Sequence, residues 1–112
     1  MNGRMSLLVY PTKDMASAKT LFKALLGVDP YADAPYYAGF RTGDLEIGLD
    51  PNASSSGPIA YWDVEDIGAG LQLLVDAGGQ TVQDVKDVGG GLLIATVKDA
   101  AGNTLGLRQS PR

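Results

Sequence analysis

The chain has 112 residues, no cysteine, no histidine and a formal net charge of −4. Its 45% hydrophobic and 20% charged residues are typical of a folded globular domain and exclude a disordered chain. Without cysteine there are no disulfides and no thiolate nucleophile or ligand. Without histidine, the commonest general base and transition-metal ligand is missing.

The charges and apolar runs also limit the partners of the chain. The nine Lys and Arg residues are scattered and form no basic run, which argues against binding to nucleic acid. No apolar run approaches the roughly 18 residues of a membrane span, and the apolar run near the N-terminus is too short for a signal peptide. We therefore expect a cytoplasmic protein that contacts neither nucleic acid nor membrane.

The chain begins with a predicted strand and an amphipathic helix. Residues 5–10 are a strand that ends at Pro11. Asp14 has the position of a helix N-cap, and Gly27 is suited to close the helix that spans 14–26. The apolar residues of this helix recur at helical spacing: Met15, Ala18, Leu21, Phe22, Leu25 and Leu26.

A hairpin follows a short polar segment over 28–34, which predicts a weak edge strand. Strands over 36–42 and 45–50 are joined by the turn Gly43-Asp44, a strong hairpin signal. Because strand side chains alternate, each strand has two faces. In the first strand one face carries Tyr36, Ala38 and Phe40, and the other carries Tyr37, Gly39 and Arg41. In the second strand one face carries Leu45, Ile47 and Leu49, and the other carries Glu46 and Gly48.

The second half of the chain repeats this order after a linker over 51–58. A strand over 59–64 precedes a helix capped by Asp66, whose apolar positions are Ile67, Leu71, Leu74 and Val75. Gly78-Gly79 ends that helix, and strands over 80–86, 92–98 and 104–109 follow it. We predict an α+β fold with a mixed sheet, one domain over 1–112 built from two tandem βαβββ modules, 5–50 and 59–109.

The last turn and strand contain an unusual glycine. Gly106 lies between Leu105 and Leu107, which share the opposite face of the strand. A glycine inside a strand marks a bulge or a place where another group approaches closely.

This organisation resembles the vicinal oxygen chelate superfamily, which includes glyoxalase I, bleomycin resistance proteins and extradiol dioxygenases. Three stretches carry the resemblance: Tyr10 to Gly27, Ala60 to Ile67, and Lys98 to Gln109, in which Ala100 replaces the usual proline of the family turn. The resemblance implies that both modules fold a curved sheet around a cavity. It also implies a divalent metal, held by His or Glu on the first and fourth strands of each module.

The positions that the resemblance assigns to the metal lack its ligands. They fall near Leu7 and Ile59 on the first strands, and on Glu46 and Gly106 on the last. One carboxylate does not hold a catalytic metal, because open sites need about three protein ligands. We therefore expect the fold and cavity of the family without a metal or cofactor, and space beside Gly106 for an organic ligand.

Several residues are candidates for contact with such a ligand, and each has a structural alternative. Glu46 is a candidate general base or acceptor for a cationic ligand, or else a solvated carboxylate. Trp62 is a candidate stacking wall, or else a core or dimer-interface anchor. Arg41 is suited to pair with a carboxylate, or else is a surface charge. The sequence leaves open whether Tyr61 or Trp62, and Tyr36 or Tyr37, faces the cavity. The predicted ligand-binding residues are Tyr10, Tyr37, Arg41, Glu46, Trp62 and Gly106.

The sequence predicts a metal-independent protein that binds a small organic ligand as a homodimer, with a role in sequestration or resistance. One alternative is a metal-free isomerase or lyase that uses Glu46 as its base. Another is a degenerate domain that acts only through its surface. The sequence does not identify the ligand.

Overall fold

The computed structural model describes residues 1–53 and 57–111. It divides the chain into two compact units, Ser6–Ile59 and Met1–Met5 with Ala60–Arg112. The division falls next to the predicted start of the second module at residue 59. The predicted linker over 51–58 includes residues 54–56, which lie outside the described residues. We describe the two units separately, as module one and module two, and assign a strand that crosses the division to the module that holds most of its residues.

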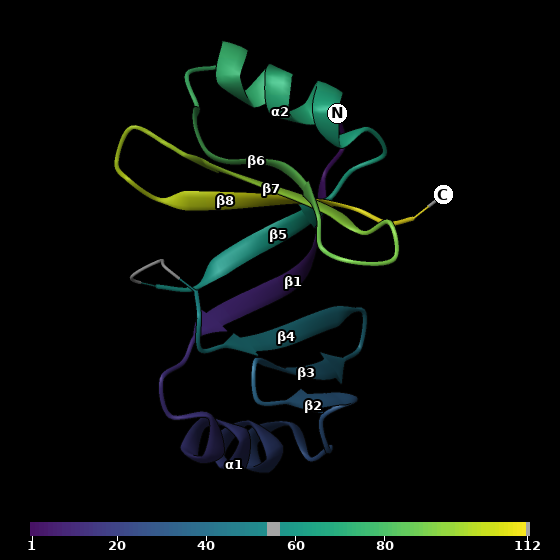
Figure 1. Cartoon of the computed structure of the whole chain (residues 1–112), viewed down its shortest axis with the longest axis vertical. Coiled ribbons are helices and arrows are strands. Elements are labelled where there is room, and N and C mark those ends of the chain that lie inside the picture. Colours follow the sequence, from purple (N-terminus) through teal and green to yellow (C-terminus); the bar gives the residue numbers. More distant parts are fainter. Residues whose placement is uncertain (54–56, 112) are drawn as a thin grey trace. The chain divides into compact units, whose positions relative to one another are not determined.

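Module one contains a small mixed sheet and one helix (Figure 1). Its strands lie in the order β2-β3-β4-β1. β4 pairs in parallel with β1, and the other neighbours are antiparallel. The elements are β1 (Arg4–Pro11), α1 (Met15–Leu26), β2 (Ala32–Ala34), β3 (Tyr37–Thr42) and β4 (Leu45–Asp50).

The ends of α1 are those that the sequence predicts. The Asp14 carboxylate accepts a hydrogen bond from the Ser17 N–H at 3.0 Å, and Gly27 closes the helix with a positive φ of 71°. The prediction that Leu21 and Leu25 belong to the packed apolar stripe is wrong, because these residues are 68% and 75% exposed. Each precedes a packed residue by one position, which turns it about 100° away from the sheet.

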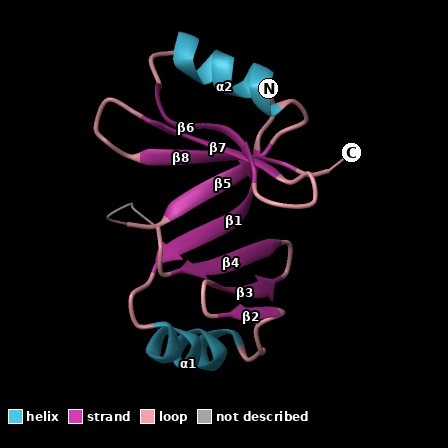
Figure 2. Ribbon diagram, viewed as in Figure 1, coloured by secondary structure: helices cyan, strands magenta, loops and turns pink. Residues whose placement is uncertain are grey.

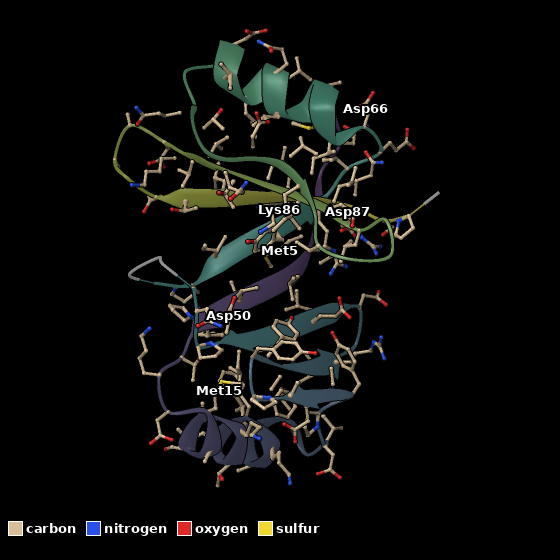
Figure 3. The ribbon with its side chains drawn as sticks, in the orientation of Figure 1. Met5, Met15, Asp50, Asp66, Lys86 and Asp87 are labelled. Carbon is tan, nitrogen blue, oxygen red and sulfur yellow. The ribbon has the colours of Figure 1, made fainter. Side chains whose placement is uncertain are left out.

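One face of the module-one sheet packs against α1. Its fully buried residues include Phe40 and Leu49, and the ring centroid of Phe22 on α1 lies 6.1 Å from that of Phe40. Met15 extends from α1 toward the strands (Figure 3). The other helix residues that pack against this cluster are Ala18 and Leu26. The alternation predicted for the hairpin is therefore confirmed, with Ala38, Phe40, Ile47 and Leu49 on the helix side.

Module two repeats the same order of elements (Figure 2). Its strands lie in the order β5-β8-β7-β6, with β5 and β8 parallel and the other neighbours antiparallel. The elements are β5 (Ile59–Asp63), α2 (Ile67–Asp76), β6 (Gln80–Asp87), β7 (Leu93–Lys98) and β8 (Thr104–Gln109).

The core of module two lies between α2 and its sheet. Asp66 caps α2 by accepting a hydrogen bond from the Ala69 N–H at 3.1 Å, and Figure 3 shows Asp66 at this end of the helix. Val75, predicted in the apolar stripe, is instead exposed. The buried cluster consists of Val64, Ile67, Leu71, Ala95, Val97 and Leu107.

The structure confirms the predicted α+β class with two βαβββ modules and mixed strand pairing. In the described part of the chain, neither helix is long and apolar enough to cross a membrane.

Candidate ligand site

The strands of module one have a second face, turned away from α1, which we call the helix-free face of module one. Since Phe40 and Ile47 point toward the helix, their neighbours along β3 and β4 point away from it. This face carries Tyr37, Gly39 and Arg41 on β3, and Glu46 and Gly48 on β4.

Two tyrosines lie directly on the backbone of this face. Gly39 and Gly48 are cross-strand partners. A Cβ added at Gly39 would lie 2.8 Å from the Cζ and Oη atoms of Tyr31, and one added at Gly48 would collide with the Tyr37 hydroxyl. Each glycine thus makes room for an aromatic side chain from its own module, because any larger residue would displace it.

An ion pair lies next to the two glycines on the same face. Arg41 and Glu46 are cross-strand partners, and the Arg41 Nε lies 3.6 Å from the Glu46 Oε1, longer than a hydrogen bond. The Arg41 Cζ lies 3.9 Å from the centroid of the Tyr31 ring, in cation–π contact. The side chain of Arg41 is 64% exposed and that of Glu46 is 19% exposed. Glu46 is therefore the inner member of the pair and Arg41 the outer one.

Two contacts position the Arg41 guanidinium among the described residues, the Tyr31 ring and the Glu46 carboxylate. Within residues 1–53 and 57–111, none of its N–H groups donates a hydrogen bond. A guanidinium has five such donors in a fixed planar fork. Arg41 can therefore accept a planar anion without first giving up a hydrogen bond.

Tyr31 was not among the predicted site residues. A signal for it exists in the sequence, because the two-residue turn Gly43-Asp44 fixes the hairpin register. That register pairs Gly39 with Gly48 and Arg41 with Glu46. A pair of glycines facing each other across two strands leaves a space that a nearby aromatic side chain can fill.

Tyr10, one of the predicted ligand-binding residues, does not lie on the helix-free face. It packs against the core cluster on the opposite side, and its ring centroid is 5.2 Å from that of Phe22. Alternation along β1 instead turns Leu7 and Val9 toward the helix-free face, where both are buried. Tyr36, outside β3, is exposed, and Tyr37 is the tyrosine of the pair on the helix-free face.

In module two, Tyr61 rather than Trp62 lies on the face turned away from the helix. Tyr61 is the strand partner of Gly106, whereas Trp62 is the partner of Leu107, which packs in the core beneath α2. A Cβ added at Gly106 would collide with the ring of Tyr61. The space predicted beside Gly106 is therefore filled by Tyr61, and a ligand contact of Trp62 would lie on the other face.

The strand registers also correct the correspondence between the modules. Val9 pairs with Gly48, and Tyr61 pairs with Gly106. Val9 and Tyr61 each precede the aspartate that caps the next helix by five residues. Gly106 therefore corresponds to Gly48, and both glycines have a tyrosine lying on them.

Because Gly48 and Gly106 are the equivalent positions on the last strands of the two modules, Glu46 is not the module-one equivalent of Gly106. Those two positions are glycines, so neither supplies a ligand atom from a side chain. Among the described residues, no group of three or more His, Cys, Asp or Glu side chains could hold a metal ion. The residues present do not fit the divalent metal that the family pattern implies.

Module two has its own ion pair on the face turned away from α2. The Arg108 Nε donates a hydrogen bond of 2.9 Å to the Asp63 Oδ1, and the two side chains are 15% and 33% exposed. Unlike Arg41, Arg108 is committed to a partner within its own module. Of these two arginines, Arg41 is thus the more accessible cation.

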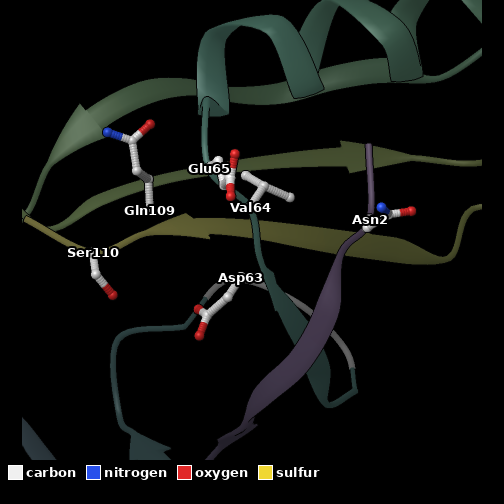
Figure 4. Close-up of a pocket in the computed structure, with 6 residues that line it drawn as sticks. All are labelled: Asn2, Asp63, Val64, Glu65, Gln109 and Ser110. Carbon is white, nitrogen blue, oxygen red and sulfur yellow. The ribbon is translucent and has the colours of Figure 1, made fainter.

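A separate pocket lies at the start of α2 (Figure 4). It has a volume of about 570 Å³, and its six lining residues include none of the predicted ligand-binding residues. The side chain of Gln109 is engaged there, since its Oε1 accepts a hydrogen bond from the Ile67 N–H at 2.9 Å. The lining residues are Asn2, Asp63, Val64, Glu65, Gln109 and Ser110.

Solved structures share this fold at low sequence identity. A hypothetical protein from Bacillus halodurans is 14% identical, with a TM-score of 0.80 over 100% of this chain and 97% of that chain. A glyoxalase/bleomycin resistance protein/dioxygenase superfamily member from Vibrio splendidus is 16% identical, with a TM-score of 0.74 over 97% and 100%. A methylmalonyl-CoA epimerase variant from Streptomyces coelicolor is 16% identical, with a TM-score of 0.71 over 96% and 94%. These likenesses show the fold alone.

Comparison of the sequence itself with known families assigns nearly the whole chain. No curated protein matches the chain. The model of the Glyoxalase/Bleomycin resistance protein/Dioxygenase superfamily, in contrast, matches residues 4–107. Together with two βαβββ modules, this match shows that the chain belongs to the glyoxalase/bleomycin resistance protein/dioxygenase superfamily.

Proposed function

We propose that this protein binds a small organic molecule on the helix-free face of module one, without a metal. The observation that carries the proposal is the Arg41 guanidinium, which lies on the Tyr31 ring with none of its N–H groups hydrogen-bonded among the described residues. Tyr37 adds a second aromatic surface beside Gly48. An aromatic surface with a few fixed polar groups is typical of small-molecule sites.

Binding without chemistry suits a role in sequestration or resistance. The missing metal ligands support this role, because the metal chemistry of the superfamily needs side chains that the equivalent positions lack. We also propose that the protein is a cytoplasmic homodimer. Light scattering that gives the mass of a single chain would refute the dimer without affecting the proposed site.

A thermal-shift screen of organic molecules, with and without EDTA, tests the binding function. We expect some compounds to raise the melting temperature equally under both conditions, because a ligand that binds only the folded state stabilises it. The same compounds should have less effect on Arg41→Gln and an unchanged effect on Arg4→Gln, an exposed arginine on β1. A large loss of stability on adding EDTA would refute metal independence.

The alternative function is a metal-free isomerase or lyase in which Glu46 removes a proton next to a carbonyl group. The observation that favours it is the position of Glu46, partly shielded and beside a cation that could stabilise developing negative charge. An epimerase occurs among the structural neighbours, but its identity to this chain is too low to support more than the fold.

Glu46→Gln separates the two functions. If Glu46 is the base, turnover of any substrate found should fall by about 100-fold or more, because general base catalysis contributes on the order of 10²–10⁴. Asp44→Asn, in the turn of the same hairpin, is the matched control and should leave turnover unchanged. Unchanged turnover in Glu46→Gln would exclude this role, whereas retained ligand binding is what the binding function predicts.

A further inference from the structure

The arrangement around Arg41 points to the chemical class of the ligand. We propose that the helix-free face of module one binds a flat organic carboxylate, held by the Arg41 guanidinium and stacked beside Tyr31 and Tyr37. This inference rests on the proposed binding function and makes it more specific.

The guanidinium is held in place before any ligand arrives. Its Cζ lies 3.9 Å from the Tyr31 centroid, and the Tyr31 ring lies on the backbone of Gly39. The Tyr31 N–H also donates a hydrogen bond to the Gly39 carbonyl at 2.9 Å, which fixes this tyrosine to β3. A guanidinium held on a ring loses less conformational freedom when it binds a carboxylate through two parallel N–H bonds.

The partner of Arg41 in the protein leaves these donors available. Glu46 approaches the Arg41 Nε only to 3.6 Å, whereas Asp63 in module two approaches the Arg108 Nε to 2.9 Å. A ligand carboxylate can therefore form hydrogen bonds to Arg41 that Glu46 does not make. The same ligand would find no such donor at the Nε of Arg108.

The order of the two charges favours an anion over a cation. Arg41 is the outer residue at 64% exposure, and Glu46 is the inner residue at 19%. A molecule approaching this face therefore meets the positive group first. An amine could contact Glu46 only over the small part of its side chain that remains exposed.

The glycine pair defines the shape of the rest of the ligand. Gly39 and Gly48 bring the side chains of Tyr31 and Tyr37 close to the sheet, beside the ion pair. Aromatic rings arranged in this way stack favourably against another flat group. A carboxylate attached to an aromatic or other planar body satisfies both features.

Titration of the full-length protein with benzoate tests the inference, with benzamide as the uncharged probe of the same shape and benzylamine as the cationic one. With EDTA present throughout, we expect benzoate to bind at least tenfold more tightly than either of the other two compounds. The reason is that charge-assisted hydrogen bonds are stronger than hydrogen bonds between neutral groups. Increasing the salt concentration should weaken benzoate binding, because salt screens exposed charges. Shifts of the Arg41 side-chain N–H signal in NMR spectra locate the contact.

Variants around Arg41 separate its role from a general effect on the fold. Arg41→Gln should weaken benzoate binding about tenfold or more and leave benzamide unaffected, while Arg4→Gln should change neither. Tyr31→Phe keeps the ring and should bind benzoate like the wild type, whereas Tyr31→Leu should bind several-fold more weakly. Glu46→Gln should bind benzoate more tightly, because a like charge is removed.

Equal binding of benzoate and benzamide, or unchanged benzoate binding in Arg41→Gln, would overturn the carboxylate assignment. If neutral or cationic compounds from the thermal-shift screen still bound to the same face, the proposed binding function would stand while this inference failed. If no compound bound to the helix-free face of module one, both would fail.

Discussion

The two modules share the same order of elements, but the arginine–carboxylate ion pair of each module differs in length and exposure. In module two, Arg108 donates a 2.9 Å hydrogen bond to Asp63, and both groups are partly buried. In module one, the pair of Arg41 and Glu46 is longer, and Arg41 is largely exposed on a tyrosine ring. The difference indicates that the pair in module two supports the fold, and it agrees with the ligand contact that we propose for Arg41.

The same contrast applies to the two glycines at equivalent positions. The ring atoms that cover Gly106 are on the side of the Tyr61 ring that is attached to the Tyr61 backbone. Gly48 instead contacts the hydroxyl end of Tyr37. The far end of a side chain can move aside more easily than its base. We therefore expect a larger residue to be tolerated less well at Gly106 than at Gly48.

The largest effect should come from the core of module one. Phe40→Ala should lower the free energy of unfolding by about 3–5 kcal/mol, because Phe40 is fully buried and its removal leaves a cavity. Val97→Ala in module two should cost less, about 2 kcal/mol, because fewer buried methyl groups are lost. Urea unfolding followed by circular dichroism measures both, and a larger loss in Val97→Ala would contradict this ranking.

Adding one methyl group at the equivalent glycines should separate the two faces. Gly106→Ala should cost about 1–3 kcal/mol, because the new Cβ collides with the ring of Tyr61 close to its attachment. Gly48→Ala should cost less, because the end of Tyr37 can move away. As a control, Gly106→Ala should have little further effect in a Tyr61→Ala background, and an equal cost in both backgrounds would contradict the explanation.

Replacing either arginine should again cost more stability in module two than in module one, but the difference between the modules should be smaller. Arg108→Gln should lower stability by about 1–2 kcal/mol, because it breaks a partly buried, charge-assisted hydrogen bond. Arg41→Gln should change stability by less than about 0.5 kcal/mol, because exposed ion pairs contribute little. Thermal unfolding provides the comparison, and an equal cost for both would show that Arg41 is as structural as Arg108.

The smallest effect concerns the last turn of module two and depends on pH. The side-chain amide of Asn103, followed by its backbone N–H, lowers the pKa of the Asp99 carboxyl below its ordinary value of 3.8. Because the pKa is lower in the folded state, this contribution to stability is present above pH 3.8 and is lost as the pH falls through the folded-state pKa.

Asn103→Ala removes the largest cause of that shift in the pKa of Asp99. The variant should be less stable than the wild type at pH 7, with a smaller difference at about pH 3. Asn52→Ala is the control, since the Asn52 contact with Asp50 uses its backbone N–H. A difference for Asn103→Ala that is the same at both pH values would contradict the assigned cause.

Local signals in the sequence were sufficient to predict the elements. Asp14 and Asp66 mark the starts of both helices, and the turn Gly43-Asp44 fixes the hairpin, because caps and turns depend on a few neighbouring residues. The outward position of Leu25 was missed, because helical spacing alone does not define the width of the packed stripe.

The site was harder to predict, because it depends on contacts between elements. Arg41 and Glu46 were recognised as candidates, but the aromatic partner of Arg41 comes from the segment before β2. The sequence predicts a close approach at Gly106 and space for a ligand beside it. The structure instead places the ring of Tyr61, from the neighbouring strand, against this glycine. The alternation of side chains along a strand predicts the face on which a residue lies. It does not predict which side chain from another element will pack on that residue.

The most direct test of the account is a map of backbone amide shifts in NMR spectra, recorded in EDTA, as a compound from the thermal-shift screen is added. We predict that the shifts concentrate on β3 and β4, at Gly39, Arg41, Glu46 and Gly48, and that they weaken in Arg41→Gln. Shifts concentrated around Gly106 and Arg108 of β8, or binding that disappears with EDTA, would contradict the account.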